Sequence, residues 1–371
     1  MVLPTSGNLI KFSDIETEFG QNTDRDLGEY RISQTVGDLS NQPLDAGIPQ
    51  SGTIKFSDFH GKRLNVIIDY HTGETEYRPT VAKTRYDATA GTGSHTVLTG
   101  GWYKERPTNS GGTKTRIHVN KTIGSLRGGT GESNCAVRTG TGWNAGTVLT
   151  VEIGANGALY GAGGDGGNGG NSSTSYDGED GNSGLGIQYD GTTVINNGII
   201  SGGYGGGGGG GYRRIEKEEP GPSESEHGYG GGGGGGQGYP GGEGGSGGTS
   251  GAAYIGGDGT TTTGGNGGEG STDCRSGRCA HGGGGGGGST NGTGGEGGGG
   301  NDGGNGTVTA GGSGASGTHT GGSIESEENI TGSGGAGGAL GAAIRRVSGI
   351  TVNITDNVSG INGATDATGV S

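Results

Sequence analysis

The chain has 371 residues, of which 104 are glycine and only 25% are hydrophobic. Globular proteins contain about 7% glycine, so this composition excludes an ordinary enzyme core spread evenly along the chain. Eight prolines and uninterrupted glycine runs exclude collagen, which needs glycine at every third position with abundant proline. The net charge of −14 disfavours a nucleic acid partner. No apolar stretch approaches the ~20 residues of a membrane-spanning helix, so no membrane insertion is expected.

The N-terminal segment, residues 1–70, contains an internal repeat. The stretch Ile-Lys-Phe-Ser-Asp occurs at residues 10–14 and again at residues 54–58, each time after a proline turn. Each copy predicts a turn, a short strand and the start of a helix. Ser13 and Glu16 form a capping box, which predicts a short helix through Phe19. The first residues lack the basic and apolar regions of a signal peptide, so we expect synthesis in a cytoplasm.

Residues 64–160 have the pattern of β structure, and residues 71–160 are assigned to one small β-rich domain. Short runs rich in β-branched residues, at 66–68, 116–119 and 147–153, are separated by turn clusters. This part predicts a small β-sandwich or barrel-like domain. The N-terminal part of the chain is therefore expected to be all-β, with little α-helix.

Glycine is concentrated in one block. Residues 1–160 contain 23 glycines and residues 342–371 contain 4, so 77 lie in residues 161–341. Such composition is typical of disorder, because glycine loses the most entropy on folding and buries no side chain. Parts of the block, however, repeat with period three, the period of a polyproline-II-type helix.

The second interpretation is a bundle of polyglycine-II helices joined by backbone hydrogen bonds. In each triplet, two glycines would face neighbouring helices and the third residue would point outward. The outward residues in this arrangement are Asp165, Asn168, Glu243, Thr249, Asn266 and Glu269. The tail, residues 342–371, alternates around 350–354 and predicts a closing strand.

Polar, charged segments interrupt the glycine block. They are expected either as loops displayed on a rigid scaffold, the usual place for recognition, or as solvated linkers. Tyrosines beside the glycine runs favour recognition, because Tyr gives a large contact area at low entropy cost, although they also suit packing on bare glycine rods. The candidate binding residues are Tyr176, Asp177, Tyr212, Arg213, Arg214, Glu216, Lys217, His227, Tyr239, Tyr254, Arg275, Arg278, His281, His319 and Glu325.

Catalytic and cofactor signals are weak. The many G-x-G-x-x-G matches lack the strand and helix that a dinucleotide site requires. Cys274 and Cys279 leave three alternatives open: a small disulfide loop, free thiols, or a zinc site with His281. The glycine triplets lack the large apolar residue of calcium-binding repeats. We therefore expect no enzyme activity, no cofactor and no metal.

Several segments resemble known phage proteins. Residues 54–62, Ile-Lys-Phe-Ser-Asp-Phe-His-Gly-Lys, resemble a motif near the start of many tailed-bacteriophage tail proteins. Residues 119–125, 134–140 and 157–167 are similar to the module that precedes glycine-rich ends in such proteins. The alternation of glycine runs with polar loops is similar to the tip adhesins of T-even-like phage long tail fibres.

This resemblance implies a virion tail protein, a tail fibre or tip adhesin, made in the host cytoplasm. It implies that residues 161–341 form an ordered polyglycine-II bundle whose end loops recognise a host receptor, either an outer-membrane protein or a polysaccharide. Residues 1–70 would then attach the chain to other virion tail proteins. The alternative is a structural tail component without receptor contact; an ice-binding protein is disfavoured by the long charged loops. The sequence leaves open whether the chain forms a homo-oligomer.

Overall fold

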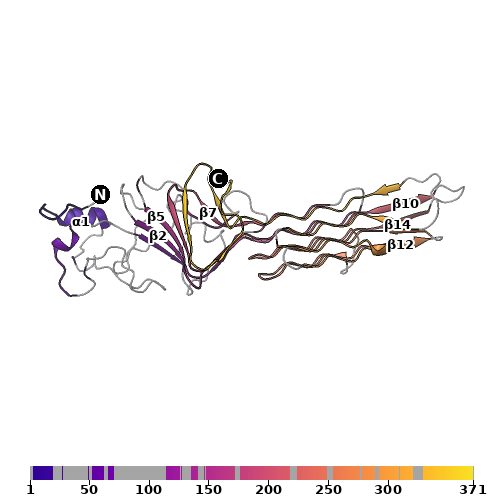
Figure 1. The fold of residues 1–371 in the computed structure, drawn as a ribbon, viewed down its shortest axis with the longest axis horizontal. Coiled ribbons are helices and arrows are strands. Elements are labelled where there is room, and N and C mark those ends of the chain that lie inside the picture. The colour runs from indigo at the N-terminus through magenta and orange to yellow at the C-terminus, as the bar shows by residue number, and fades with distance from the viewer. Residues whose placement is uncertain are drawn as a thin grey trace.

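The protein is elongated (Figure 1). The N-terminus and the helix α1 lie at one end, a group of β-sheets follows, and glycine-rich segments extend to the strands β10, β12 and β14 at the other end. The computed structural model describes residues 3–19, 27, 49, 52–61, 66–70, 114–125, 127, 135–140, 146, 148–171, 176–217, 224–248, 254–275, 278–288, 292–308, 310–320 and 329–370.

The two copies of the N-terminal repeat form equivalent structures. The α-helix α1 (Phe12–Phe19) and the 3-10 helix η2 (Phe56–Phe59) each begin at the repeated Phe. In each copy the Asp carboxylate accepts the backbone N–H of the lysine three residues earlier, at 2.9 Å for Asp14 and 2.8 Å for Asp58. The predicted short helix through residue 19 is therefore confirmed.

The two copies pack against each other. The rings of Phe12 and Phe56 meet edge to face, with centroids 6.2 Å apart. Ile15 and Phe59 are completely buried, and the N–H of Gly61 donates to Pro4 O at 2.9 Å. The repeat thus builds one small paired unit.

Most of the remaining strands form three parallel sheets. The first sheet contains β1 (Val66–Tyr70), β2 (Lys114–Val119), β5 (Val148–Ile153), β8 (Thr192–Asn196) and β17 (Val352–Asp356), in that order. The second contains β3 (Thr122–Gly124), β6 (Ala158–Tyr160), β9 (Ile199–Ser201) and β18 (Ile361–Asn362). The third contains β4 (Cys135–Arg138), β7 (Ser183–Ile187), β16 (Ile344–Arg346) and β19 (Ala367–Thr368).

The chain visits these three sheets in turn, so the strands form successive coils of a three-sided β-solenoid. Every strand pair in the three sheets is parallel. The expected sandwich or barrel is therefore wrong. Strand signals in the sequence do not distinguish antiparallel pairing within a domain from parallel pairing between coils. The structure is mostly β with very little helix, as predicted.

Alternating side chains fill the interior of the solenoid. On β5, Leu149, Val151 and Ile153 are at most 1% exposed, whereas Val148 is 50% exposed. The three buried residues of β5 belong to one hydrophobic core that also contains residues from the N-terminal unit and from the C-terminal coil. The alternation that predicted a strand therefore also identifies its buried face.

The glycine-rich segments are insertions at a single corner of the solenoid. Residues 161–182 separate β6 from β7, and residues 202–343 separate β9 from β16. Both insertions lie between a strand of the second sheet and a strand of the third. Strands before and after each of the predicted domain boundaries, at residues 160 and 341, therefore belong to the same sheets.

Within the insertions the backbone forms extended segments, here called rods, that run side by side (Figure 1). The rods are residues 161–170, 176–182, 202–212, 229–238, 241–248, 254–260, 264–271, 282–288, 292–297, 301–307, 310–317 and 332–341. A 3-10 turn, η5 (Gly298–Gly300), follows one of them. Backbone N–H and C=O groups of neighbouring rods bond to one another at 2.7–3.3 Å.

Three inner rods, 202–212, 229–238 and 282–288, bond to one another and are surrounded by the others. Their centres are the uninterrupted glycine runs 205–211, 230–236 and 282–288, in which every residue is buried. Within these runs a Cβ at any position would meet the backbone of a neighbouring rod, so only glycine fits there.

The outer rods follow the triplet pattern. Asn168, Glu243, Asn266 and Glu269 are exposed as expected, and Asp165 is half-buried. Thr249 lies outside the described residues. Uninterrupted glycine therefore marks the inner rods, and triplets mark the surface.

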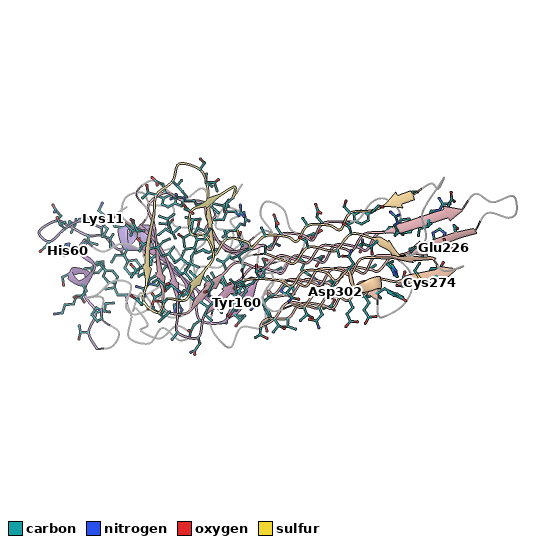
Figure 2. All side chains as sticks on the ribbon, turned by 45° about the vertical axis from the view of Figure 1, so that its right-hand side comes forward. Lys11, His60, Tyr160, Glu226, Cys274 and Asp302 are labelled. Carbon is teal, nitrogen blue, oxygen red and sulfur yellow. A yellow bond between two sulfur atoms is a disulfide. The ribbon has the colours of Figure 1, made fainter. Side chains whose placement is uncertain are left out.

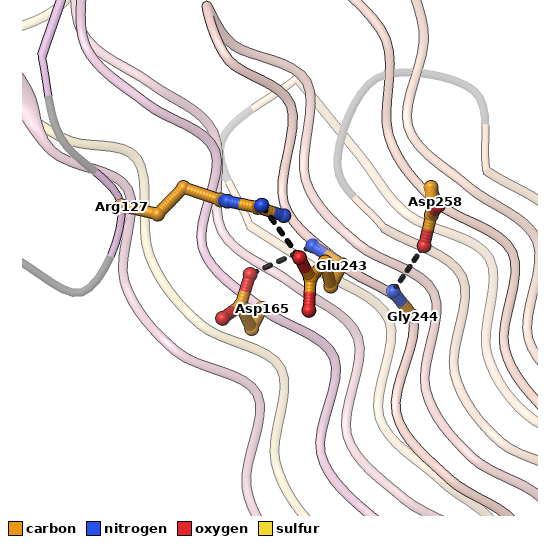
Figure 3. A network of polar contacts seen from close by, with 5 residues as sticks. All are labelled: Arg127, Asp165, Glu243, Gly244 and Asp258. Carbon is orange, nitrogen blue, oxygen red and sulfur yellow. Dashed lines mark hydrogen bonds and ion pairs between the residues drawn. The ribbon is translucent and has the colours of Figure 1, made fainter.

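Asp and Asn side chains brace the outer rods. Their Oδ1 atoms accept backbone N–H groups of an adjacent outer rod, which satisfies donors that no rod faces. The acceptor–donor pairs are Asp165–Glu243 (2.7 Å), Asn168–Ser246 (2.8 Å), Asp177–Ala336 (2.7 Å), Asp180–Ala339 (2.7 Å), Asp258–Gly244 (2.9 Å), Asn266–Thr293 (3.1 Å), Asn305–Gly294 (2.8 Å) and Asp302–Gly297 (3.0 Å). Figure 3 shows two of these braces beside the ion pair that joins Arg127, next to the solenoid, to Glu243 at 2.5 Å.

Asp356 caps the last coil of the solenoid. Its carboxylate accepts hydrogen bonds from Asn196 Nδ2 at 2.9 Å and from the N–H groups of Val358, Gly360 and Ile361. Partial desolvation acts to raise the pKa of Asp356, but these hydrogen bonds outweigh it and hold the pKa below its usual value. A depressed pKa stabilises the fold above the unfolded-state value of about 4 and loses that contribution as the pH falls through the folded-state value.

We therefore expect Asp356→Asn to lose less stability than the unmodified protein when the pH is lowered from about 7 to about 3. The measurement is the denaturant midpoint at both values. Asp366→Asn, an exposed position on the same coil, is the control for the equal change in charge. Identical pH dependence of Asp356→Asn and the unmodified protein would contradict the capping role.

Among the described residues, no helix is long and apolar enough to cross a membrane.

Candidate functional site

Two small antiparallel sheets end the bundle opposite the N-terminus (Figure 1). One contains β11 (Glu224–Gly228), β10 (Arg213–Lys217) and β15 (Asn329–Thr331), in that order. The other contains β12 (Thr272–Arg275), β13 (Arg278–His281) and β14 (Thr318–Thr320). They continue the rods, so the bundle holds them at a distance from the solenoid.

Strand alternation divides the β10–β11 hairpin into two faces. The register pairs Arg214 with His227 and Glu216 with Ser225, and Tyr212 and Tyr229 precede and follow these strands. We call these six residues the tip face. All are half-buried except Tyr212, which is 4% exposed.

The aromatic rings of the tip face form one hydrogen-bonded cluster. His227 Nδ1 lies 2.6 Å from Tyr212 Oη, and His227 Nε2 lies 2.9 Å from Ser225 Oγ. His227 stacks on Tyr229 with centroids 6.0 Å apart, and Tyr212 lies 5.6 Å from Tyr229. The cluster therefore fixes the Tyr212 hydroxyl and both ring nitrogens of His227 by hydrogen bonds, and Tyr229 joins it by ring contacts.

The charges of the tip face are also paired. Arg214 and Glu216, two residues apart on one strand, form an ion pair. The pKa of Tyr212 is raised above its ordinary value, first by desolvation and then by the neighbouring Tyr229, against an opposing effect of Arg214. Burial among these rings thus favours the neutral form of the Tyr212 hydroxyl.

The opposite face of this hairpin is buried. Arg213 is 6% exposed and bonds to Thr331 Oγ1, and Ile215 and Glu226 are each 1% exposed. Glu226, labelled at the tip in Figure 2, has one carboxylate oxygen without a hydrogen-bond partner among the described residues. The expectation that Arg213 is an exposed loop residue is corrected, since alternation along β10 turns it inward.

The β12–β13 hairpin carries a disulfide. Cys274 and Cys279 are directly opposed in the register and bonded, with an S–S distance of 2.09 Å. A disulfide leaves neither thiolate available as a metal ligand. His281, also expected to be exposed, is 6% exposed, with Nδ1 3.1 Å from Thr272 Oγ1.

Cysteine accessibility provides a direct check of this arrangement. Burial raises the pKa of the Cys135 thiol to about 12, against opposing effects of Arg345 and Arg138. We therefore expect a thiol reagent at about pH 8 to label no cysteine in the native protein. Of the three cysteines, only Cys135 should react in denaturant without reductant. All three should react in denaturant after the disulfide has been reduced. Labelling of Cys274 or Cys279 in unreduced protein would contradict the disulfide.

Side chains in β12 and directly before it hold the edge of the tip face. Ser271 Oγ accepts the N–H of Tyr229 at 2.7 Å, and Asp273 Oδ2 accepts the N–H of His227 at 3.4 Å. The Ser271 N–H in turn donates to Tyr229 O at 2.9 Å. The disulfide-bonded hairpin thus contacts the strand that carries the aromatic cluster.

The remaining candidate residues lie in several places. Tyr176, which is 55% exposed, and Asp177 begin an outer rod, and Tyr254 begins another. Tyr239 lies at the opposite end of the bundle, where its N–H donates to Gly161 O at 3.1 Å. The other candidates within the tip strands are Lys217, Arg275, Arg278 and His319. Glu325 lies outside the described residues.

Sequence reasoning placed Tyr212, Arg214, Glu216 and His227 among the candidates and omitted Ser225 from them. Alternation outward from His227 identifies Ser225 and Tyr229 as neighbours on the same face once residues 224–228 are read as a strand. The supporting roles of Ser271 and Asp273 had no signal in the sequence, since they depend on contact between separate hairpins.

Comparison with known proteins identifies the family. A family model described as phage tail fibre adhesin Gp38 matches residues 85–280, more than half of the chain, and the chain belongs to this family. The protein is therefore a component of a phage virion tail, and the family indicates a structural, non-enzymatic protein. This confirms the resemblance inferred from the sequence.

Among solved structures, the crystal structure of the gp37-gp38 adhesin tip complex of the bacteriophage S16 long tail fiber aligns over 86% of this chain and 89% of that chain. The sequence identity is 16% and the TM-score 0.36. No curated protein matches the chain.

Proposed function

We propose that this tail fibre adhesin recognises a host surface receptor, an outer-membrane protein or a polysaccharide, through the tip face. The observation that carries the proposal is a set of aromatic and charged side chains, half-buried except for the buried Tyr212, at the end of the bundle farthest from the N-terminus. Tyr and Arg are enriched among residues that dominate binding energy. Fixed hydrogen bonds within the cluster reduce the entropy lost on binding.

The scaffold proposed for this face is a polyglycine-II bundle. Period-three triplets, hydrogen bonds between rods and the burial of the all-glycine runs support this assignment. Such a bundle would hold the tip face in place without a hydrophobic core. The stiffness of the scaffold would let several weak contacts act together.

The N-terminal unit is proposed to attach the chain to other virion tail proteins, with residues 1–70 as the attachment segment. It lies at the end opposite the tip face (Figure 1). Leu9 is 79% exposed and Phe56 is 41% exposed there, although both are large apolar residues. The proposal for this end rests on its position opposite the tip face, and these two side chains are candidates for the contact.

The test of receptor recognition uses intact virions. Tyr229→Ala removes a ring from the tip face without changing charge, and Thr293→Ala is the control on an exposed position of an outer rod. We expect Tyr229→Ala to slow adsorption to susceptible host cells by about tenfold or more, and Thr293→Ala to leave it unchanged.

Assembly and folding are checked on the same virions by counting fibres in micrographs and by protease resistance. Normal fibres with unchanged adsorption of Tyr229→Ala would favour a structural component without receptor contact. Adsorption of Arg214→Ala virions, measured with the same controls, shows whether the charged side chains of the tip face contribute to binding as well as the aromatic rings.

A further inference from the structure

We propose that the Cys274–Cys279 disulfide positions the tip face, and that the face binds its receptor more weakly when this disulfide is reduced. The proposal rests on the proposed function of the tip face. It concerns how that site is regulated: the cysteines are on β12 and β13, whereas the tip face is on β10 and β11. The connection between the two hairpins therefore carries the argument.

The connection consists of hydrogen bonds from β11 to the side chains that precede Cys274. Because β11 is an edge strand, alternate backbone N–H groups point away from its own sheet. Those of His227 and Tyr229 donate to Asp273 Oδ2 and Ser271 Oγ. Asp273 is the residue directly before Cys274, so the position of this acceptor depends on the end of β12.

The end of β12 lies at the edge of its sheet. β12 is a four-residue strand, and among the described strands it pairs only with β13. At its last position the register places Arg275 opposite Arg278. The disulfide is one residue away and keeps the pair closed, so its loss would free Asp273.

A displaced Asp273 would affect the aromatic cluster through the strand it holds. The His227 ring bonds to Tyr212 Oη at one nitrogen and to Ser225 Oγ at the other. Its position therefore depends on that of the β11 backbone. In this scheme Asp273 is a positioning residue, and the tip face is the surface that it positions.

The redox state is expected to change between synthesis and adsorption. A virion protein is made inside a cell, where thiols stay reduced, and acts outside, where disulfides persist. Oxidation proceeds by exchange with a small-molecule disulfide. One cysteine thiolate attacks the small-molecule disulfide, forms a mixed disulfide and releases one half of the reagent as a thiolate. The second cysteine then attacks the mixed disulfide and releases the other half, so the two protein thiols lose two electrons and two protons in all. Cys274 is exposed and Cys279 half-buried, so the bond is within reach of such reagents.

The first experiment measures positioning without any receptor. Amide hydrogen exchange of the full chain is compared with and without a phosphine reductant, resolved to the amides of His227 and Tyr229. We expect reduction to speed their exchange by about tenfold, while amides of the inner rods at Gly208 and Gly233 stay unchanged. Equal exchange in both states would overturn the proposal.

Two variants separate the bond from other effects of the reductant. With both cysteines replaced, Cys274→Ser and Cys279→Ser, exchange at His227 should be fast in both conditions. Asp273→Ala should raise exchange at His227 with the disulfide intact, whereas Asp273→Asn keeps an oxygen acceptor and should behave like the unmodified protein. A response of the serine double variant to reductant would count against the disulfide as the cause.

The second experiment measures adsorption of virions to host cells. Reduced virions should adsorb about tenfold more slowly and recover after reoxidation with glutathione disulfide. If Tyr229→Ala abolishes adsorption but reduction changes neither exchange nor adsorption, the redox proposal fails and the proposed function stands. If exchange responds to reduction but Tyr229→Ala adsorbs normally, the positioning role is supported and the tip face is not the receptor site.

Discussion

Replacement of Gly208 by alanine is expected to destabilise the bundle by about 3 kcal/mol or more. Gly208 lies in an inner rod, and a Cβ there would collide with the carbonyl oxygen of Gly335 in a neighbouring rod. That oxygen belongs to backbone, which cannot rotate away as a side chain does. The rods must separate, and hydrogen bonds between them are lost together. Thermal unfolding and resistance to protease measure the effect.

Gly304→Ala provides the matched control. Gly304 belongs to an outer rod and is exposed, and the nearest atom to a Cβ there is Ser313 N at 3.4 Å. We expect this variant to be unchanged or stabilised by up to about 1 kcal/mol, because alanine reduces the entropy of the unfolded chain. Equal effects of the two substitutions would show that burial within the bundle is not what requires glycine.

Replacement of Leu149 by alanine is expected to destabilise the solenoid by about 3 kcal/mol. The side chain is 1% exposed and lies in the core that joins the coils. Its removal leaves a cavity that parallel strands held on both sides cannot fill. Val148→Ala is the control, since the adjacent residue on β5 is 50% exposed, and a change within about 0.5 kcal/mol is expected.

The same pair of variants tests whether solenoid and bundle unfold together. The rods leave and re-enter the solenoid at one corner, so loss of the coils would release the ends of the bundle. We expect Leu149→Ala to lower the denaturant concentration at which the amides of β5 lose protection from hydrogen exchange. The amides of the inner rods should lose protection at the same lowered concentration. A shift confined to β5 would mean that the bundle is stable without its anchor.

The candidate site was only partly predictable from the sequence. Local composition selected Tyr212, Arg214 and His227, because aromatic and charged residues beside glycine runs are unusual. It could not exclude Arg213, because which side of a strand faces inward depends on the sheet packed against it. Tyr239 is a candidate in the sequence because it lies beside a glycine run. In the structure it follows the end of rod 229–238 that lies beside the solenoid, where its N–H donates to Gly161 O.

The sequence alone determined the local character of each segment. β-branched alternation predicted β5, the repeated Phe-Ser-Asp predicted a helix start, and glycine triplets predicted extended rods with an outward residue, because these depend on near neighbours along the chain. Only the tertiary structure decided that β9 pairs with β18 across residues 202–360 and that uninterrupted glycine runs occupy the inner rods. Those outcomes arise from backbone hydrogen bonds between distant segments. Such bonds are almost independent of side-chain identity, so the sequence carries little record of which segments they join.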